Sequence, residues 1–189
     1  MHKLILASAS PRRLQLLQQI GLTPEVVTAD IDETPFDNES PEACVQRLAL
    51  EKAKKVAAFN PSAVVIAADT FGVLNQQLLL KPKDFEDAKI MWQAMSGNWH
   101  TVMTAVAVVQ DQQERVILQQ SRVLFAQISE QAMHDYWLSG EPQDKAGAYA
   151  IQGLAAVWVE KIEGSYSSIM GLPLYETAQL LKLFSCKVL

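Results

Sequence analysis

The sequence predicts an α/β protein built on a mixed sheet, and two kinds of pattern carry this prediction. Residues 3–7 and 63–68 are short, uninterrupted apolar runs, typical of strands buried on both faces. Residues 99–110 and 115–128 predict two long strands joined by a polar turn, which favours an antiparallel pair. Helical patterns separate the other strands, as in parallel connections. We therefore expect a mixed, twisted sheet with helices flanking it.

The first strand leads directly into a helix. Ser10 can cap this helix, Pro11 suits its first position and Gly21 ends it. Residues 25–28 then predict a short strand, and residues 30–39 an acidic loop. The apolar stripe of the helix consists of Leu14, Leu17 and Ile20.

A second, longer helix starts at Ser40-Pro41 and runs to about residue 59, where Asn60-Pro61 ends it. The apolar run at 63–68 follows and delivers Asp69 at the end of a buried strand. The residues at helical spacing on the second helix are Val45, Leu48, Ala49, Lys52 and Val56.

Predicted strands and helices also alternate along the rest of the chain. A polar, glycine-bearing segment at 141–153 is not expected in the core, and no repeat or linker marks a domain boundary. We therefore expect a single domain over residues 1–189. The remaining predicted elements are a hairpin at 75–77, helices at 85–95, 129–139 and 173–184, a strand at 154–162 and a turn at 163–164.

Composition limits the possible functions. The 189 residues include 16 Lys and Arg against 21 Asp and Glu, a net charge of -5, which argues against broad binding to DNA, RNA or an anionic membrane. Cys44 and Cys186 lack metal-ligand spacing and are too few for a disulfide framework, so a reducing compartment is expected. The apolar run at residues 4–6 is shorter than the roughly 7–15 residues of a secretory segment. We therefore expect a soluble, cytoplasmic protein.

A candidate phosphate site lies where the first strand meets the first helix. Ser8, Arg12 and Arg13 bring hydroxyl and guanidinium groups to the positive end of the helix dipole, beside free main-chain N–H groups. Because an arginine in a first turn opposes the dipole, a nearby anion would favour it. The alternative is a capped helix with two solvent-exposed arginines.

Asp69 is a candidate for catalysis because ligands of open α/β sheets collect beyond the carboxyl ends of strands. A carboxylate there can bind Mg²⁺ or take a proton from water. A turn or capping aspartate is the alternative. Glu33 and Asp32 in the acidic loop could supply further metal ligands, or could simply be solvated.

Two lysines and a glutamine complete the candidates. Lys52 interrupts an apolar stripe, where a lysine either extends to solvent or meets an anion. Lys81 precedes Pro82, and Gln152 offers donors and acceptors to a base edge from the loop at 144–153. The three histidines lack zinc spacing, and no GxGxxG, Walker A, GxSxG or HExxH motif is present. This excludes the commonest dehydrogenase, P-loop, hydrolase and metalloprotease interpretations.

Taken together, these segments resemble the Maf family of nucleoside triphosphate pyrophosphatases, from residue 4 to about residue 181. Segments 149–153 and 164–173 are similar to the branch that hydrolyses dTTP and UTP, rather than to the branch acting on 7-methyl-GTP. The resemblance implies a Maf/Ham1-like two-lobed fold with an active-site cleft between the lobes, a divalent metal and a homodimer. It is carried by residues 6–13, 67–70, 81–82, 96–104, 147–153 and 164–174.

The resemblance also implies roles for individual residues. The phosphate-binding positions fall on Ser8, Arg12, Arg13, Lys52 and Lys81. The metal and catalytic base positions fall on Asp69 and Glu33, and the base-reading position on Gln152. The chain departs from the family pattern in the hairpin that carries Lys81, at Phe71, Gly72 and Leu80.

The chemistry implied is metal-assisted attack of water on the α-phosphorus, which releases pyrophosphate and leaves the monophosphate. Mg²⁺ or Mn²⁺ suits an oxygen-only ligand set. The expected partners are dTTP and UTP, with no DNA, RNA or membrane, and clearance of non-standard pyrimidine nucleotides is an expected role. Family members are also known as septum-formation inhibitors, so the alternative is a non-catalytic, nucleotide-binding regulator of cell division, which would not need Asp69.

Overall fold

The computed structural model describes residues 3–188, and the chain forms two compact units. Unit 1 comprises Met1–Asp69, Thr104–Gln119 and Gly171–Leu189. Unit 2 comprises Thr70–Met103 and Gln120–Met170. Each unit is therefore assembled from segments that are far apart in the sequence. The long strands that contribute residues to both units are β3 (Val64–Leu74), β5 (Trp99–Gln110) and β6 (Gln113–Phe125).

The strands form a mixed sheet in the order β2-β1-β3-β5-β6-β7, with β4 paired to β3. β1 (Leu4–Leu6) runs parallel to β2 (Glu25–Val26) and to β3. β4 (Gln77–Leu79) is antiparallel to β3, and β7 (Val159–Glu163) is antiparallel to β6. β5 and β6 are neighbours joined by a two-residue turn, which fits an antiparallel pair. The predicted mixed α/β architecture is confirmed.

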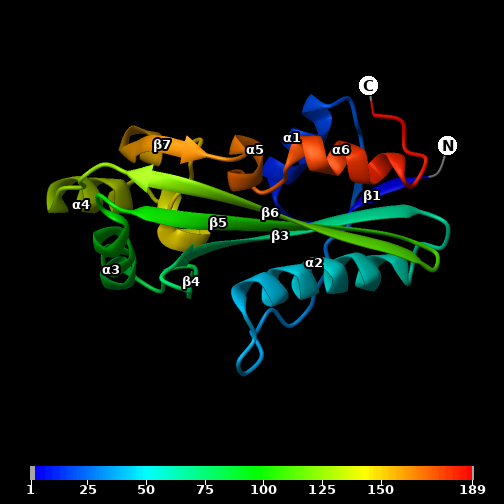
Figure 1. Ribbon diagram of the computed structural model, residues 1–189, viewed down its shortest axis with the longest axis horizontal. Helices are drawn as coiled ribbons and strands as arrows, with labels where there is room; N and C mark the ends of the chain where they lie inside the picture. Colours follow the sequence, from blue (N-terminus) through cyan, green and yellow to red (C-terminus); the bar gives the residue numbers. More distant parts are fainter. Residues whose placement is uncertain (1–2, 189) are drawn as a thin grey trace. The chain divides into compact units, whose positions relative to one another are not determined.

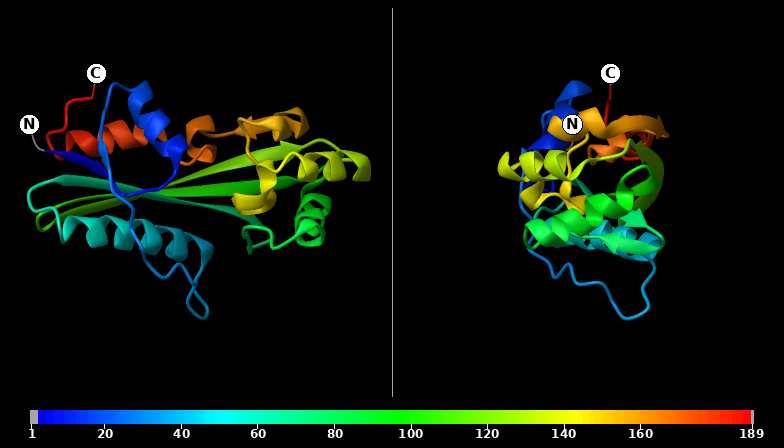
Figure 2. Two further views of the ribbon diagram at one scale, coloured as in Figure 1. Left: turned by 180° about the vertical axis from the view of Figure 1, so that it is seen from behind. Right: turned by 90° about the vertical axis from the view of Figure 1, so that its left-hand side faces the viewer.

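Helices cover both faces of the sheet in unit 1 (Figures 1 and 2). α1 (Pro11–Gln19) and α6 (Leu174–Lys182) lie on one face, and α2 (Pro41–Ala57) lies on the other. The apolar stripes of these helices pack onto strands that are buried on both faces, which agrees with the uninterrupted apolar runs in the sequence. The fully buried side chains include Ile5, Leu6, Leu17, Val45, Leu48, Ile66 and Leu181.

Unit 2 has an aromatic core. The rings of Phe125 and Tyr149 lie edge to face with centroids 4.9 Å apart, and those of Tyr136 and Trp158 are 4.8 Å apart. Trp92 is fully buried, and its indole N–H is satisfied by a hydrogen bond to the carbonyl of Ala148 at 2.9 Å. The helices around this core are α3 (Phe85–Met95), α4 (Glu130–Leu138), α5 (Tyr166–Ile169) and three short 3₁₀ helices, η1 (Glu141–Asp144), η2 (Ala146–Ala148) and η3 (Leu154–Trp158).

Several predicted boundaries are wrong. Residues 154–158 form η3 rather than a strand, and the short helix α5 was not predicted. The segment at 141–153 was not expected in the core, but it buries residues 148–151. β3 continues to Leu74 instead of ending before Asp69, because its second half pairs with β4. The hairpin predicted at 75–77 is confirmed by that pair.

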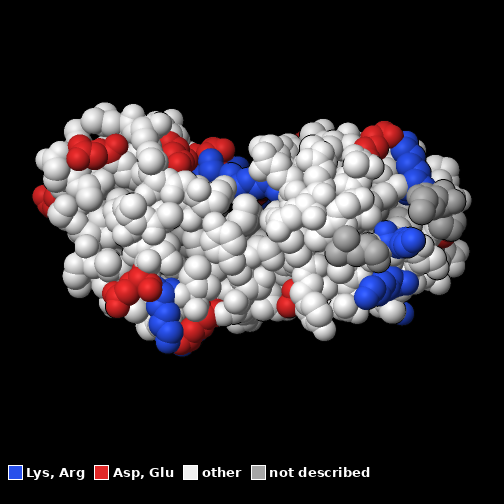
Figure 3. Space-filling model, turned by 90° about the horizontal axis from the view of Figure 1, so that it is seen from above, with Lys and Arg blue, Asp and Glu red and all other residues white. Residues whose placement is uncertain are grey.

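Charged side chains lie in separate groups on the face of the molecule drawn in Figure 3. On the face drawn in Figure 3, Lys and Arg atoms are separated by Asp, Glu and uncharged atoms. Cys44 and Cys186 are free thiols. No helix within residues 3–188 is long and apolar enough to cross a bilayer.

Candidate active site

The junction of β1 and α1 is organised by Ser8. Its hydroxyl oxygen accepts hydrogen bonds from the N–H of Ser10 and from Nη1 of Arg13, both at 3.2 Å. Ser10 occupies the N-cap position, but its side chain makes no capping hydrogen bond, so the predicted cap is wrong in that detail. The buried Ser8 side chain therefore links the start of the helix to an arginine of its first turn.

Arg13 is anchored rather than solvated. Its Nε donates to the carbonyl of Gly171 at 2.9 Å, a residue far along the chain in the same unit. Burial and the neighbouring Arg12 lower the pKa of Arg13, while Asp69 and Glu33 act in the opposite direction. An arginine nevertheless stays protonated under physiological conditions. The interpretation of two solvent-exposed arginines is therefore wrong for Arg13.

Lys52 bridges two carboxylates. Its Nζ lies 2.6 Å from Oδ1 of Asp69 and 2.7 Å from Oε1 of Glu33. The side chains of Lys52 and Asp69 are each about 10% exposed, whereas that of Glu33 is 57% exposed. Of the two outcomes expected for a lysine on an apolar stripe, the structure shows the meeting with an anion. Lys52, Asp69 and Glu33 therefore form one charge cluster on α2, β3 and the acidic loop.

The acidic loop is held in place by Arg47 of α2, which the sequence analysis missed. Arg47 pairs with both carboxylate oxygens of Glu39, at 2.6 and 2.7 Å, and its Nη2 donates to the carbonyl of Thr34 at 3.2 Å. The hydrogen bonds from Arg47 lower the pKa of Glu39 to about 2. Because Thr34 follows Glu33 directly, Arg47 fixes the part of the loop that carries Glu33. In the sequence, the acidic residue at helical spacing from Arg47 is Glu51, which does not point to this loop.

Asp32 is used within the loop itself. Its Oδ1 accepts the N–H of Thr34 at 2.9 Å. Hydrogen bonds from the side chain and main chain of Thr34 lower the pKa of Asp32. Asp32 therefore stabilises the turn of the acidic loop, whereas Glu33 forms an ion pair with Lys52.

The donor set of the charge cluster suits a hard divalent cation. Oδ2 of Asp69 is buried and has no hydrogen-bond partner within the described chain. Asp69 and Glu33 offer oxygen ligands only, which Mg²⁺ and Mn²⁺ prefer. Among residues 3–188 there is no group of three or more His, Cys, Asp or Glu side chains that could hold a metal without further ligands. The residues fit a cation that takes its remaining ligands from water or a phosphate.

The two remaining candidates, Lys81 and Gln152, lie in unit 2, on segments that are joined there. The N–H of Gly147 donates to the carbonyl of Leu80 at 3.1 Å, next to the exposed Lys81. Gly147 has φ of 70°, a left-handed conformation that favours glycine. The loop with the phosphate-binding candidate and the loop with the base-reading candidate are therefore hydrogen-bonded to each other.

Gln152 is exposed, but the chain on both sides of it is fixed. The N–H of Ala150 donates to the hydroxyl of Tyr136 at 3.1 Å, and the N–H of Leu154 donates to the carboxylate of Glu141 at 3.0 Å. Tyr136 in turn donates to Glu141 Oε1 at 2.7 Å. The sequence did not predict that Tyr136 and Glu141 hold the main chain around Gln152. Their hydrogen bonds reach into a segment whose composition is that of an ordinary polar loop.

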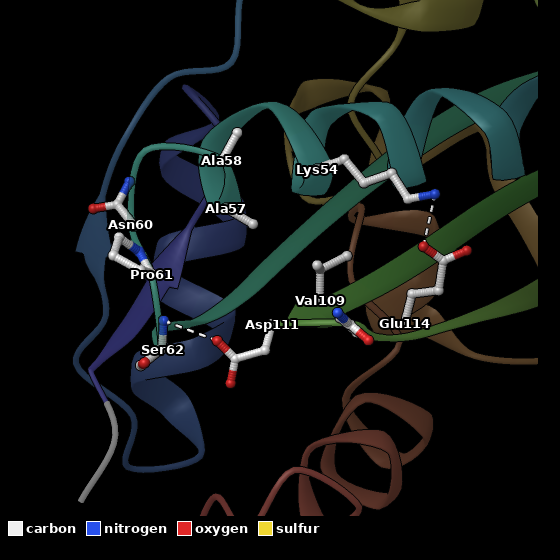
Figure 4. A pocket seen from close by; sticks show the side chains of 10 residues that line it. Lys54, Ala57, Ala58, Asn60, Pro61, Ser62, Val109, Asp111 and Glu114 are labelled. Atoms are coloured by element: carbon white, nitrogen blue, oxygen red, sulfur yellow. Dashed lines mark hydrogen bonds and ion pairs between the residues drawn. The ribbon is translucent and has the colours of Figure 1, made fainter.

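A pocket of about 240 Å³ also lies in unit 1, at the C-terminal end of α2 and the turn between β5 and β6 (Figure 4). Lys54 pairs with Glu114 at 2.6 Å on its rim, and the N–H of Ser62 donates to Asp111 at 3.2 Å. None of the candidate catalytic or binding residues lines it. This pocket is therefore separate from the candidate site residues.

Comparison with known proteins decides the family. A model of the Maf family, described as Maf-like protein, matches residues 3–184. The chain belongs to the Maf family. This Maf chain is 49% identical over 190 residues to a dTTP/UTP pyrophosphatase of Hahella chejuensis, which covers 99% of this chain and 94% of that protein. A dTTP/UTP pyrophosphatase of Pseudoalteromonas atlantica is 47% identical over 188 residues, 96% of this chain and 97% of that protein.

The Maf chain also shares its fold with a solved structure. A HAM1 protein from Coxiella burnetii superposes with a TM-score of 0.52 over 97% of this chain and 100% of that chain. The two sequences are 15% identical, so this likeness concerns the fold alone. It agrees with the Ham1-like α/β architecture that the family resemblance implied.

Proposed function

We propose that this Maf chain is a nucleoside triphosphate pyrophosphatase that hydrolyses dTTP and UTP to the monophosphate and pyrophosphate. The observation that carries the proposal is the buried Asp69 carboxylate, with one oxygen on Lys52 and the other without a partner in the described chain. A buried acceptor of this kind can take a proton from an attacking water. The relatives named dTTP/UTP pyrophosphatase support the choice of substrate.

A divalent cation, Mg²⁺ or Mn²⁺, belongs to this proposal, with Asp69 and Glu33 as its protein ligands. When bound, such a cation supplies positive charge between the carboxylates and the phosphates and polarises the phosphoryl oxygens. Asp69 orients the water and accepts its proton as the water attacks the α-phosphorus. Glu33, on the loop fixed by Arg47, completes the acidic side of the site.

The cationic residues bind the triphosphate in this proposal. Arg12 and Arg13 stand at the start of α1, where main-chain N–H groups also favour phosphate. Ser8 orients Arg13 through its hydroxyl. Lys81 supplies a further charge, and Gln152 pairs with the O4/N3–H edge that thymine and uracil share.

We further propose that the protein is a cytoplasmic homodimer. Light scattering at several protein concentrations tests the assembly, because a dimer gives twice the mass of the chain. Fractionation of the producing cell tests the location. Neither result bears on the hydrolytic activity.

The direct test of the activity is to incubate purified protein with dTTP and Mg²⁺ or Mn²⁺ and to identify the products. We expect dTMP and pyrophosphate in equal amounts, and no activity after chelation of the metal. UTP should also be hydrolysed, whereas CTP and 7-methyl-GTP should be poor substrates. Release of dTDP and orthophosphate would contradict the proposed reaction, and tight binding of dTTP without products would favour the non-catalytic regulator.

A further inference from the structure

The ammonium group of Lys52 lies between Asp69 and Glu33, the two carboxylates proposed as ligands of the divalent cation. It is within 2.7 Å of an oxygen of each carboxylate. Two cations held by the same pair of carboxylates repel each other, and this repulsion is large where the groups are buried. The side chains of Lys52 and Asp69 are each about 10% exposed, so solvent screens them little.

A second lysine on the same helix shows what an ordinary ion pair looks like in this chain. Lys54 lies 2.6 Å from Glu114, a distance equal to that between Lys52 and Asp69. Its side chain is 51% exposed and that of Glu114 is 46% exposed, so this pair contributes little to stability. Lys52 differs because loss of its charge would remove the ammonium group that is hydrogen-bonded to a buried carboxylate.

We propose that Lys52 is the resident counterion of the candidate metal site and competes with the divalent cation for Asp69 and Glu33. The inference rests on the proposed function, because it concerns the metal of that reaction. A cation held by Oδ2 of Asp69 and by Glu33 would place a second positive charge beside Lys52 Nζ, and this repulsion favours departure of Nζ from at least one of the two carboxylates.

The released ammonium group then needs another anion, and the phosphates of the substrate supply one. Lys52 therefore couples the two binding events, since metal binding releases the lysine and the triphosphate gives it a new partner. This accounts for a residue that the family pattern assigns to phosphate but that contacts carboxylates here. Lys52 acts in this scheme as a positioning residue for the metal site.

The first test measures Mn²⁺ binding in the absence of nucleotide, by the electron paramagnetic resonance signal of free Mn²⁺. Lys52→Met keeps the length of the side chain and removes its charge. We expect Lys52→Met to bind Mn²⁺ at least about fivefold more tightly than the wild type, the lower end of typical coupling between sites. The matched control is Lys54→Met, which removes the exposed charge from the same helix and should leave Mn²⁺ affinity unchanged. Equal or weaker Mn²⁺ binding by Lys52→Met would overturn the inference.

A second test uses the wild-type protein, so it holds even if Lys52→Met does not fold. Lys52 should be acetylated slowly by an amine-reactive ester without metal, and several-fold faster when Mn²⁺ is bound. Lys54 in the same sample is the internal reference, and its rate should not change. A Lys52 rate that Mn²⁺ leaves unchanged or lowers would overturn the inference.

The failure of this inference can be told apart from failure of the proposed function. If the wild type hydrolyses dTTP but both Lys52 tests fail, the competition is wrong and the activity stands. If the Lys52 tests succeed but dTTP is not hydrolysed, the metal site is real and the proposed reaction is wrong.

Discussion

Tyr136 donates a 2.7 Å hydrogen bond to Glu141, and the two side chains hold the main chain on either side of Gln152. Tyr136 accepts the N–H of Ala150, while Glu141 accepts that of Leu154. Burial, with the hydrogen bond to Glu141, raises the pKa of Tyr136, so its hydroxyl stays protonated. The orientation of the candidate base-reading residue therefore depends on two residues outside the loop that carries it.

Glu141→Ala should reduce the discrimination between bases. The variant leaves Tyr136 and Leu154 without their acceptor, at a cost of about 1–3 kcal/mol in the free energy of unfolding. We expect kcat/KM for dTTP and UTP to fall relative to that for CTP. Glu160→Ala, at an exposed glutamate of the same unit, is the control. A stability loss with an unchanged ratio of kcat/KM values would show that Glu141 is only structural.

Gln152→Ala tests the base-reading role directly. Cytosine presents an amino donor and a bare ring nitrogen where thymine and uracil present O4 and N3–H, so one fixed amide orientation cannot serve both. An unmet polar group costs about 1–3 kcal/mol, which predicts a preference of about tenfold or more for dTTP and UTP over CTP. Gln152→Ala should flatten this preference while leaving the melting temperature near that of the wild type. An unchanged ranking of bases would remove the role from Gln152.

Asp69→Asn should lower kcat for dTTP by at least about 10²-fold, the low end for loss of a positioned base. The substitution keeps the shape of the side chain and removes its charge. Circular dichroism and the melting curve control for folding. Near-normal turnover in a folded Asp69→Asn protein would show that this carboxylate is not the base or a principal metal ligand.

Arg12→Ala and Arg13→Ala should both weaken triphosphate binding, but they should differ in stability. Arg13 donates to the carbonyl of Gly171 and to the hydroxyl of Ser8, so its loss should lower the free energy of unfolding by about 1–3 kcal/mol. Arg12→Ala should raise KM for dTTP with little change in melting temperature, as expected for a partly exposed residue. Wild-type KM and kcat in both variants would leave the arginine pair without a role in catalysis.

His100 should make stability depend on pH. Burial lowers its pKa to about 4, from an ordinary value of 6.5, and its Nε2 lies 2.8 Å from the hydroxyl of Tyr149. The unfolded chain binds this proton more readily than the folded chain does. The contribution of neutral His100 to the free energy of unfolding is therefore complete above pH 6.5 and is lost as the pH falls towards 4. At 1.36 kcal/mol for each pH unit, the loss is about 3 kcal/mol.

Urea unfolding of the wild type and of His100→Gln between pH 7 and pH 4 measures this contribution. The variant should be less stable at pH 7, but its stability should fall less steeply as the pH is lowered. Parallel curves for the two proteins would contradict the assigned titration.

The strands of unit 1 were predictable from sequence because burial on both faces leaves an uninterrupted apolar run, as at residues 63–68. The boundary at Asp69 was not, because the end of β3 is set by pairing with β4 rather than by hydrophobicity. Residues 154–158 look like a strand, yet Leu154 and Val157 are 60% and 83% exposed. The start of that segment is fixed by the hydrogen bond from the N–H of Leu154 to the carboxylate of Glu141. The two residues are 13 positions apart in the sequence, and no local sequence pattern predicts their contact.

In the candidate site, the sequence indicated which residue types carry charge, but not how they pair. The position of Lys52 on an apolar stripe predicted either solvent or an anion, and only the fold brings Asp69 and Glu33 to it. Arg47 was missed because Glu39 and Thr34, the partners through which it holds the loop, precede the helix. Pairings of this kind depend on tertiary structure, whereas the residues themselves are visible in the sequence.

The hydrogen bond between Gly147 and Leu80 has a bearing on how the chain tolerates sequence change. Both atoms belong to the main chain, so the bond does not depend on which side chain stands at position 80. That position carries a leucine here, and another side chain there would leave this link between the two loops in place. Position 147 does not tolerate substitution in the same way, because its φ of 70° would strain most residues other than glycine. A substitution is therefore tolerated at one end of this bond and strains the main chain at the other.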